Sequence, residues 1–169
     1  KKALLNTFEI MPEYLKTTSD DVVNNYRDWG IQLGRRFRAL KLWYVIRSMG
    51  VNGIKEKVKN HILWAQDLAK EIKNEQGFIL LEPQNLSFVG FYIKPEGIHD
   101  QDKINQINQE FLHKLNNSGK LYMSHTKVKN KFVIRMVIAQ TYVTWEHVEN
   151  AWEFIKETGL KVIGESGRT

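Results

Sequence analysis

The sequence contains no cysteine and only three prolines among its 169 residues. The lack of cysteine excludes a disulfide framework, thiolate catalysis and Cys-ligated zinc, and it fits a reducing compartment, so a cytoplasmic location is expected. No stretch approaches the roughly 20 apolar residues that span a bilayer. With 42% hydrophobic and 11% aromatic residues, collagen-like, coiled-coil and disordered classes are also excluded. One ordinary globular domain's worth of chain is expected.

The common catalytic and ligand-binding signatures are missing as well. The five histidines form no i/i+4 pair and no H-E-x-x-H arrangement, so no metal site is expected. There is no G-x-S-x-G nucleophile elbow, and no glycine-rich phosphate loop of the Walker or dinucleotide type. Composition and spacing alone therefore do not name a reaction.

The chain is basic, with 25 Lys and Arg against 19 Asp and Glu, a net charge of +6 and a pI near 9.4. Most charges alternate in sign, as at residues 55–57, which is typical of solvated helix faces. The dense exception is Arg35-Arg36-Phe37-Arg38. This run leaves open an alternative function, a basic nucleic-acid-binding module in which the arginines or exposed strand aromatics (Phe88, Tyr92, Tyr122) contact single strands. Salt-dependent retention on single-stranded oligonucleotides distinguishes this alternative.

Hydrophobic periodicity predicts an α+β fold: two N-terminal helices after an extended segment, then a four-stranded antiparallel sheet with helices on one face. The irregular first 33 residues form the extended segment. The expected helices are 36–49, 54–73, 100–117 and one from about Thr144, and the expected strands are 78–81, 86–93, 121–127 and 131–139. Gly50 is placed to end the first helix, Asp100 to cap the third, and Lys129-Asn130 to turn between the last two strands.

A family resemblance goes further. Residues 26–43 read YRDWGIQLGRRFRALKLW, and PEYLK stands at 12–16, IRSMGV at 46–51, FVIR at 132–135 and AWEFI at 151–155. In this order they resemble the aromatic-L-amino-acid decarboxylases of the group II decarboxylases, which depend on pyridoxal 5'-phosphate (PLP). The resemblance runs over nearly the whole chain but covers only the C-terminal part of such an enzyme.

The resemblance implies a fold-type-I homodimer that acts on an aromatic L-amino acid, with no nucleic acid or membrane as partner. Residues 1–50 are then the tail of the large PLP-binding domain, with an active-site loop and interface helix, and residues 51–169 are the C-terminal small domain. The family's Schiff-base lysine lies in an N-P-H-K-W-type segment that this chain lacks. His113-Lys114 has the wrong neighbours to replace it. A chain that starts mid-protein, inactive alone, is therefore expected.

Tyr14 matches the family's mobile-loop tyrosine, which by the resemblance returns a proton to the substrate carbon after carbon dioxide leaves. A phenol, with a pKa of about 10, is protonated at neutral pH and suits this role. Relatives with phenylalanine at this position tend toward oxidative aldehyde formation, so Tyr14 favours amine production.

Gly34 matches the glycine that approaches the cofactor phosphate and the substrate pocket across the dimer interface. A residue without Cβ lets the backbone approach a ligand, and the N–H groups of the following helix favour an anion. Histidine-decarboxylating relatives carry serine there, so glycine leaves room for a bulkier aromatic side chain. The catalytic prediction is thus Tyr14 and the cofactor-binding prediction Gly34.

Overall fold

The computed structural model describes residue 3, residues 7–8, residue 26 and residues 37–166. The extended segment predicted at the N-terminus lies outside these residues. The chain divides into two compact units, Lys1–Glu56 and Lys57–Thr169. The boundary expected between residues 50 and 51 falls inside the first unit and stays a prediction about the enzyme's domains.

Helix α2, Arg38–Asn74, contains both of the helices predicted at the N-terminal side. Gly50 interrupts it with φ 65° and ψ 172°, a backbone conformation that glycine adopts without the strain of a Cβ. The break at Gly50 confirms the predicted end of the first helix. The second helix begins directly after it rather than at residue 54 as expected, because Asn52 and Gly53 are also helical. A single glycine costs a helix only about 1 kcal/mol, which the long packed helix that follows outweighs.

Four antiparallel strands form one sheet in the order β1-β2-β4-β3. Their bounds are Phe78–Leu80 for β1, Phe88–Ile93 for β2, Ser124–Val128 for β3 and Lys131–Val137 for β4. Lys129 and Asn130 both have positive φ, 48° and 64°, as a two-residue hairpin turn between β3 and β4 requires. The sheet and this turn agree with the sequence-based prediction.

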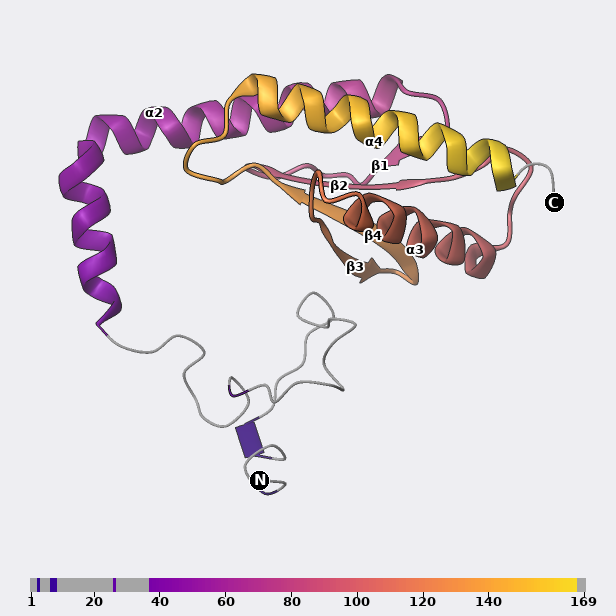
Figure 1. The fold of residues 1–169 in the computed structure, drawn as a ribbon, viewed down its shortest axis with the longest axis horizontal. Helices are drawn as coiled ribbons and strands as arrows, with labels where there is room; N and C mark the ends of the chain where they lie inside the picture. The colour runs from indigo at the N-terminus through magenta and orange to yellow at the C-terminus, as the bar shows by residue number, and fades with distance from the viewer. Residues whose placement is uncertain (1–2, 4–6, 9–25, 27–36, 167–169) are drawn as a thin grey trace. The chain divides into compact units, whose positions relative to one another are not determined.

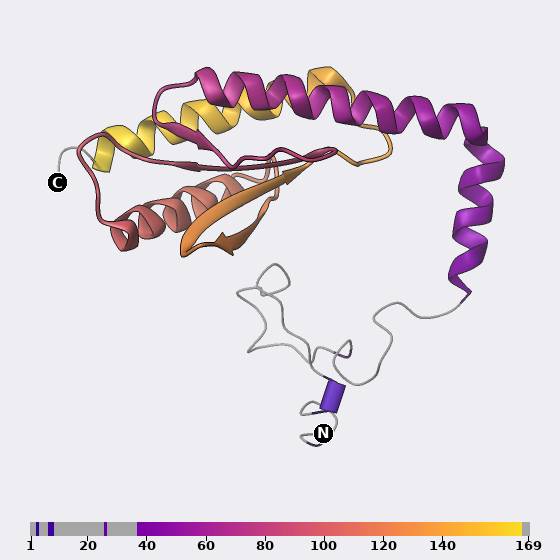
Figure 2. The same cartoon turned by 180° about the vertical axis from the view of Figure 1, so that it is seen from behind.

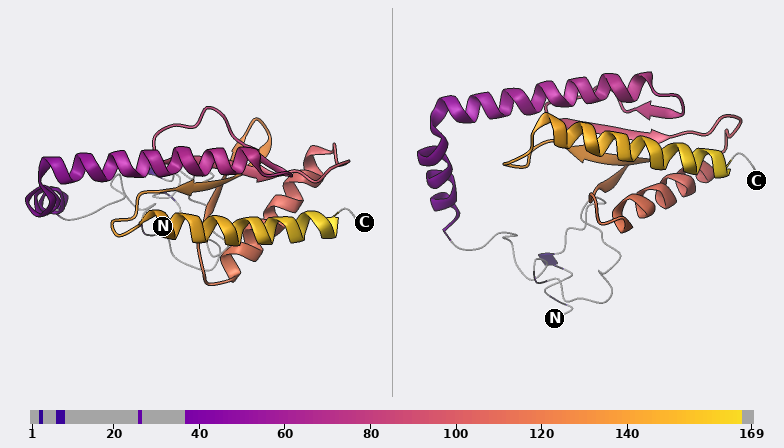
Figure 3. Two further views of the ribbon diagram at one scale, coloured as in Figure 1. Left: turned by 90° about the horizontal axis from the view of Figure 1, so that it is seen from above. Right: turned by 45° about the horizontal axis from the view of Figure 1, so that its top comes forward.

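The helices cover one face of this sheet, also as predicted. Helix α3 spans Gln101–Asn117, and the side chain of its N-cap Asp100 accepts a hydrogen bond from the Asp102 N–H at 3.0 Å. Helix α4 spans Trp145–Ser166. Figures 1 and 2 show α4 and the second half of α2 along the same side of the sheet, and the view from above in Figure 3 shows these two helices running roughly parallel.

The main core lies between this face and the helices. Phe78 of β1 occupies its centre, with its ring 5.2 Å from that of Trp152, 6.3 Å from that of Phe111 and 6.3 Å from that of Phe91. These four aromatic side chains come from β1, β2, α3 and α4, so they join the sheet to both helices. Other members are Leu68, Ile72, Val89, Ile93, Leu115, Ile134, Val148, Ile155 and Val162.

Gly159 and Gly164 of α4 differ in the space around them, so substitution by alanine is expected to change the stability of the fold in opposite directions. A Cβ at Gly159 clashes with the ring of Phe78, whose Cε atoms would lie 3.2 Å away, whereas a Cβ at Gly164 meets nothing within 4 Å. We expect Gly159→Ala to lower the free energy of unfolding by about 1–3 kcal/mol, because the buried ring must shift. Gly164→Ala is expected to raise it by up to about 1 kcal/mol through helix propensity. Urea denaturation of both variants measures this, and equal shifts would contradict the packing at Gly159.

The backbone pairing between β2 and β4 ends at the pair Phe91 and Ile134. Beyond this pair, two asparagine side chains of α3 form hydrogen bonds with the backbone of the two strands. Asn108 is completely buried. Its Oδ1 accepts from the Ile93 N–H at 2.8 Å, and its Nδ2 donates to the carbonyl oxygens of Ile93 at 2.7 Å and Ile104 at 2.8 Å. The side chain thus replaces a strand partner for Ile93.

Asn105, one turn earlier, does the same for β4. Its Oδ1 accepts from the Phe132 N–H at 2.8 Å, and its Nδ2 donates to the Asn130 carbonyl at 2.8 Å. The two asparagines therefore tie α3 to both central strands through backbone groups that have no ladder partner there.

Candidate functional site

The two site residues predicted from the sequence, Tyr14 and Gly34, lie outside the described residues. Their roles therefore stay predictions from the family resemblance.

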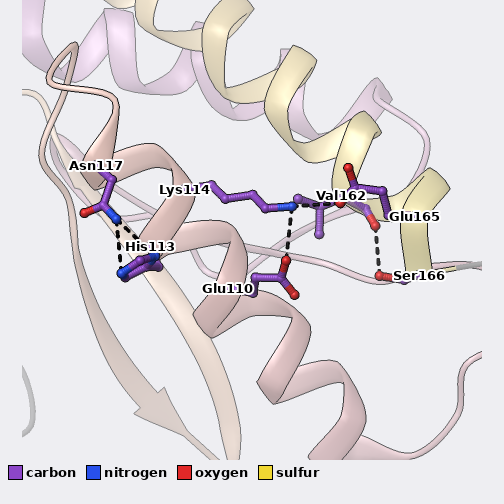
Figure 4. A network of polar contacts seen from close by, with 7 residues as sticks. All are labelled: Glu110, His113, Lys114, Asn117, Val162, Glu165 and Ser166. Atoms are coloured by element: carbon purple, nitrogen blue, oxygen red, sulfur yellow. Dashed lines mark hydrogen bonds and ion pairs between the residues drawn. The ribbon is translucent and has the colours of Figure 1, made fainter.

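Lys114 has the surroundings of a structural cation. Its Nζ lies 2.7 Å from Glu165 Oε2 of α4 and 3.1 Å from Glu110 Oε1 of its own helix α3 (Figure 4). Hydrogen bonds to Glu165 and Glu110 raise the pKa of the Lys114 ammonium above its usual value. A Schiff base requires a neutral amine, so this environment opposes one, in agreement with the sequence-based rejection of Lys114 as the cofactor lysine.

The neighbouring polar groups in Figure 4 also serve the helices. The Asn117 amide lies 3.1 Å from His113 Nε2 one helical turn away, and Ser166 Oγ donates to the Val162 carbonyl at 2.8 Å. These contacts, with the Lys114 ion pairs, connect and cap α3 and α4. The network is exposed and stabilises the helix pair only slightly.

No PLP site is formed by residues 37–166 of the structure. A shallow hollow among them is lined by Leu80, Glu82, Pro83 and Gln84, without a lysine for the aldehyde or a cation for the phosphate. The nearby Lys73 points its Nζ to Glu82 Oε1 at 2.9 Å instead. The described residues alone therefore do not fit the cofactor. Within these same residues, no three His, Asp or Glu side chains gather as metal ligands, and no helix is long and apolar enough to cross a membrane.

The nucleic-acid alternative needs exposed aromatic rings on the sheet, and two of the three candidates do not provide them. Tyr92 is only 7% exposed, and Lys131 Nζ lies over its ring at 5.4 Å. The Arg135 guanidinium lies 5.8 Å from the Phe88 ring centroid. Tyr122 is exposed but precedes β3 rather than belonging to it. Phe88 is half-buried and Tyr92 is buried, so these rings do not form the exposed stacking platform that single-strand readers use, and Arg35 and Arg36 of the basic run lie outside the described residues.

His61 is a buried group whose position the sequence reading missed. It is 7% exposed, its Nε2 has no hydrogen-bond partner, and its ring lies 5.7 Å from that of Trp64. Burial and the charge of Lys57 lower the pKa of its imidazole from 6.5. His61 is followed by Ala65 and Leu68 at steps of four and three residues, so all three lie on the buried face of α2. This helical spacing is the feature of the sequence that could have indicated that His61 is buried.

We expect His61 to make the fold sensitive to acid. Because the folded pKa lies below the unfolded value of 6.5, the unfolded chain binds more protons as the pH falls below about 6.5, and stability is lost. His61→Leu should stabilise the fold by about 1 kcal/mol and reduce its loss of stability between pH 7.5 and 5. Urea midpoints across this range measure the effect, with exposed His99→Gln as the matched control. An unchanged pH slope in His61→Leu would count against this account.

Comparison with known proteins gives a consistent result. The model of the family described as "Pyridoxal-dependent decarboxylase conserved domain" matches residues 1–94. "Tyrosine decarboxylase 4" of Petroselinum crispum is 36% identical over 169 residues, covering 97% of this chain and 33% of its own length. "Phenylacetaldehyde synthase" of Arabidopsis thaliana is 38% identical over 149 residues, covering 86% of this chain and 30% of its own length.

Among solved structures, the crystal structure of Oryza sativa TDC with PLP and tryptamine is similar, with a TM-score of 0.69 and 31% identity. The match covers 94% of this chain and 34% of that one. The chain therefore spans about a third of the length of the relatives it matches.

Proposed function

Because this chain belongs to the pyridoxal-dependent decarboxylase family, we propose that it is the C-terminal third of an aromatic-L-amino-acid decarboxylase, which releases carbon dioxide and an aryl amine. The observation that carries the proposal is the alignment with a tyrosine decarboxylase along 97% of the chain at 36% identity. The small α+β domain agrees with it, since the same fold occurs in a TDC structure that holds PLP and tryptamine.

The proposal assigns the chemistry to the complete enzyme, a cytoplasmic homodimer. When bound there, PLP supplies the electron sink for the loss of carbon dioxide. The described residues supply a packed α+β domain and no cofactor lysine, so the isolated chain is inactive. Its share of the site is Tyr14 and Gly34.

In this enzyme the Tyr14 hydroxyl donates a proton to the substrate carbon that has lost its carboxylate. A loop that closes over the substrate brings the phenol within hydrogen-bond reach and excludes water. The relatives include a protein named as an aldehyde synthase, which is 38% identical to this chain, while the tyrosine decarboxylase is 36% identical. Overall identity therefore does not separate amine producers from aldehyde producers. Tyr14 supports the amine-producing branch.

Gly34 lies at the pocket wall in this proposal, where the absence of a Cβ leaves space for an aromatic side chain. A bulky aromatic L-amino acid is therefore the proposed substrate. Tyrosine and tryptophan are the first substrates to test, because the similar proteins are named for tyrosine decarboxylation and for a complex with tryptamine.

Assays of the isolated chain test whether it is inactive without the rest of the enzyme. With PLP and either amino acid, we expect no amine and no stable visible Schiff-base band after gel filtration, because Lys114 is held as an ammonium by two carboxylates. Absorption spectra and chromatography of the products measure this. Lys114→Ala is the matched control, since it should leave the spectrum unchanged. A stoichiometric band together with amine production would overturn the proposed inactivity.

A further inference from the structure

Residues 38–49 of α2, which we call the apolar helix, expose large apolar side chains on every side. Leu42, Trp43, Tyr44 and Val45 are consecutive, and all are exposed, Leu42 by 63%, Tyr44 by 60% and Trp43 by 54%. Since a helix turns once in 3.6 residues, four consecutive residues point in all directions around its axis. Leu40 and Ile46 are exposed as well. Apolar side chains therefore point to every side of this segment, between its few polar ones.

The rest of α2 is different. Beyond Gly50, residues His61, Ala65, Leu68 and Ile72 form one buried face and polar residues form the other. Such an amphipathic helix needs one packing partner, whereas a helix that is apolar all round is typical of a position enclosed by protein. The apolar helix therefore fits a groove rather than a flat surface.

Charge distinguishes between possible occupants. The apolar helix carries Arg38, Lys41 and Arg47, and no acidic residue occurs from Trp29 to Lys55. A second copy of the same helix would bring these cations together, which is unfavourable. A partner with carboxylates around an apolar groove matches both the charge and the side chains.

We propose that the apolar helix inserts into an apolar groove with a carboxylate rim, formed by the polypeptide that precedes this segment in the complete enzyme. The inference rests on the proposed function. The relatives are about three times as long as their match to this chain, so they contain polypeptide that can supply such a groove. The family match covers residues 1–94, which include the apolar helix.

A substitution in two contexts tests the inference. The first context is the 169-residue chain; the second is a chimera in which this chain replaces the matching third of the Petroselinum crispum tyrosine decarboxylase. Trp43→Asp should leave the melting temperature of the chain within about 2 °C, because the side chain is exposed there, but lower that of the chimera by at least about 10 °C. Val58→Asp, at a comparably exposed residue of α2, is the control and should have the same small effect in both.

The carboxylate rim is tested separately, by the salt dependence of a charge-reversal variant. The double variant Arg38→Glu and Lys41→Glu should destabilise the chimera, and more so at 20 mM than at 500 mM salt, since lost attraction and new repulsion are both screened. Equal destabilisation at both salt concentrations would remove the charged rim from the proposal.

The remaining outcomes separate the two proposals. A tolerant Trp43→Asp in an active chimera overturns the inference and leaves the proposed function standing. Concentration-dependent dimers of the chain that Trp43→Asp abolishes, seen by sedimentation, make a second copy the occupant and also overturn it. A soluble chimera without decarboxylation counts against the proposed function instead, and an insoluble chimera counts against both.

Discussion

Asn108→Leu is expected to lower the free energy of unfolding of the chain by about 2–6 kcal/mol, since each buried backbone group left without a partner costs about 1–3 kcal/mol. The groups concerned are the N–H and the carbonyl of Ile93, which Asn108 bonds at 2.8 Å and 2.7 Å. Leucine has a similar volume and suits a core, so hydrophobicity alone predicts a tolerated change. A loss of stability would therefore show that the Asn108 side chain takes the place of a strand partner for Ile93, whereas a gain would show that Asn108 is only a tolerated polar residue.

Asn108→Asp is a second variant that tests the same hydrogen bonds if Asn108→Leu does not fold. Aspartate retains an acceptor for the Ile93 N–H but loses both donors, so its destabilisation is expected to be severe as well, and smaller when the carboxyl is protonated at low pH. Asn117→Ala, at the exposed end of α3, is the control and should change stability by less than about 0.5 kcal/mol. Urea denaturation and amide exchange at Ile93 measure both. A stable Asn108→Leu variant with a protected Ile93 amide would contradict the assignment.

Tyr14→Phe is expected to have the larger catalytic effect. In the chimera it should lower amine formation by about 10²–10⁴-fold, because a positioned proton donor typically contributes this much. In air-saturated buffer the substrate should instead yield the corresponding aldehyde, as the resemblance to aldehyde-forming relatives implies, with dioxygen as the oxidant and ammonia and hydrogen peroxide released. Quantifying amine, aldehyde and carbon dioxide from one reaction measures both changes.

The control for Tyr14→Phe makes the same chemical change elsewhere. Tyr142 is 81% exposed in the loop before α4, so Tyr142→Phe should leave the ratio of amine to aldehyde unchanged. Amine formation at the original rate in Tyr14→Phe would remove Tyr14 from its proposed role.

The elements with local signals could be predicted from the sequence. Gly50 ends a helix, Asp100 caps one and Lys129-Asn130 turns a hairpin, each through backbone conformations or hydrogen bonds made within a few residues. Such features depend on local chemistry, so one sequence is sufficient to find them.

Features that depend on distant contacts could not be predicted. Residues 121–123 have strand-forming side chains, but Asn116 bonds the Met123 N–H and carbonyl, both at 2.9 Å, and β3 begins at Ser124. Likewise the apolar Val58 of α2 is 51% exposed, while the polar His61 lies on the buried face. In each case a tertiary neighbour decided what local preference left open.

The candidate site shows the same limit more strongly. No spacing or composition singles out Tyr14 or Gly34; the family resemblance does, and both lie outside the described residues. What the structure adds is the environment of Lys114, whose two carboxylate partners oppose a role as the cofactor lysine.

Whether this chain is the C-terminal third of an aromatic-amino-acid decarboxylase is tested most directly by the release of labelled carbon dioxide from carboxyl-labelled L-tyrosine and L-tryptophan by the chimera. We expect carbon dioxide and the aryl amine in equal amounts, with none from the isolated chain. A soluble, PLP-loaded chimera that releases no carbon dioxide from either amino acid, beside an active parent enzyme, would contradict it.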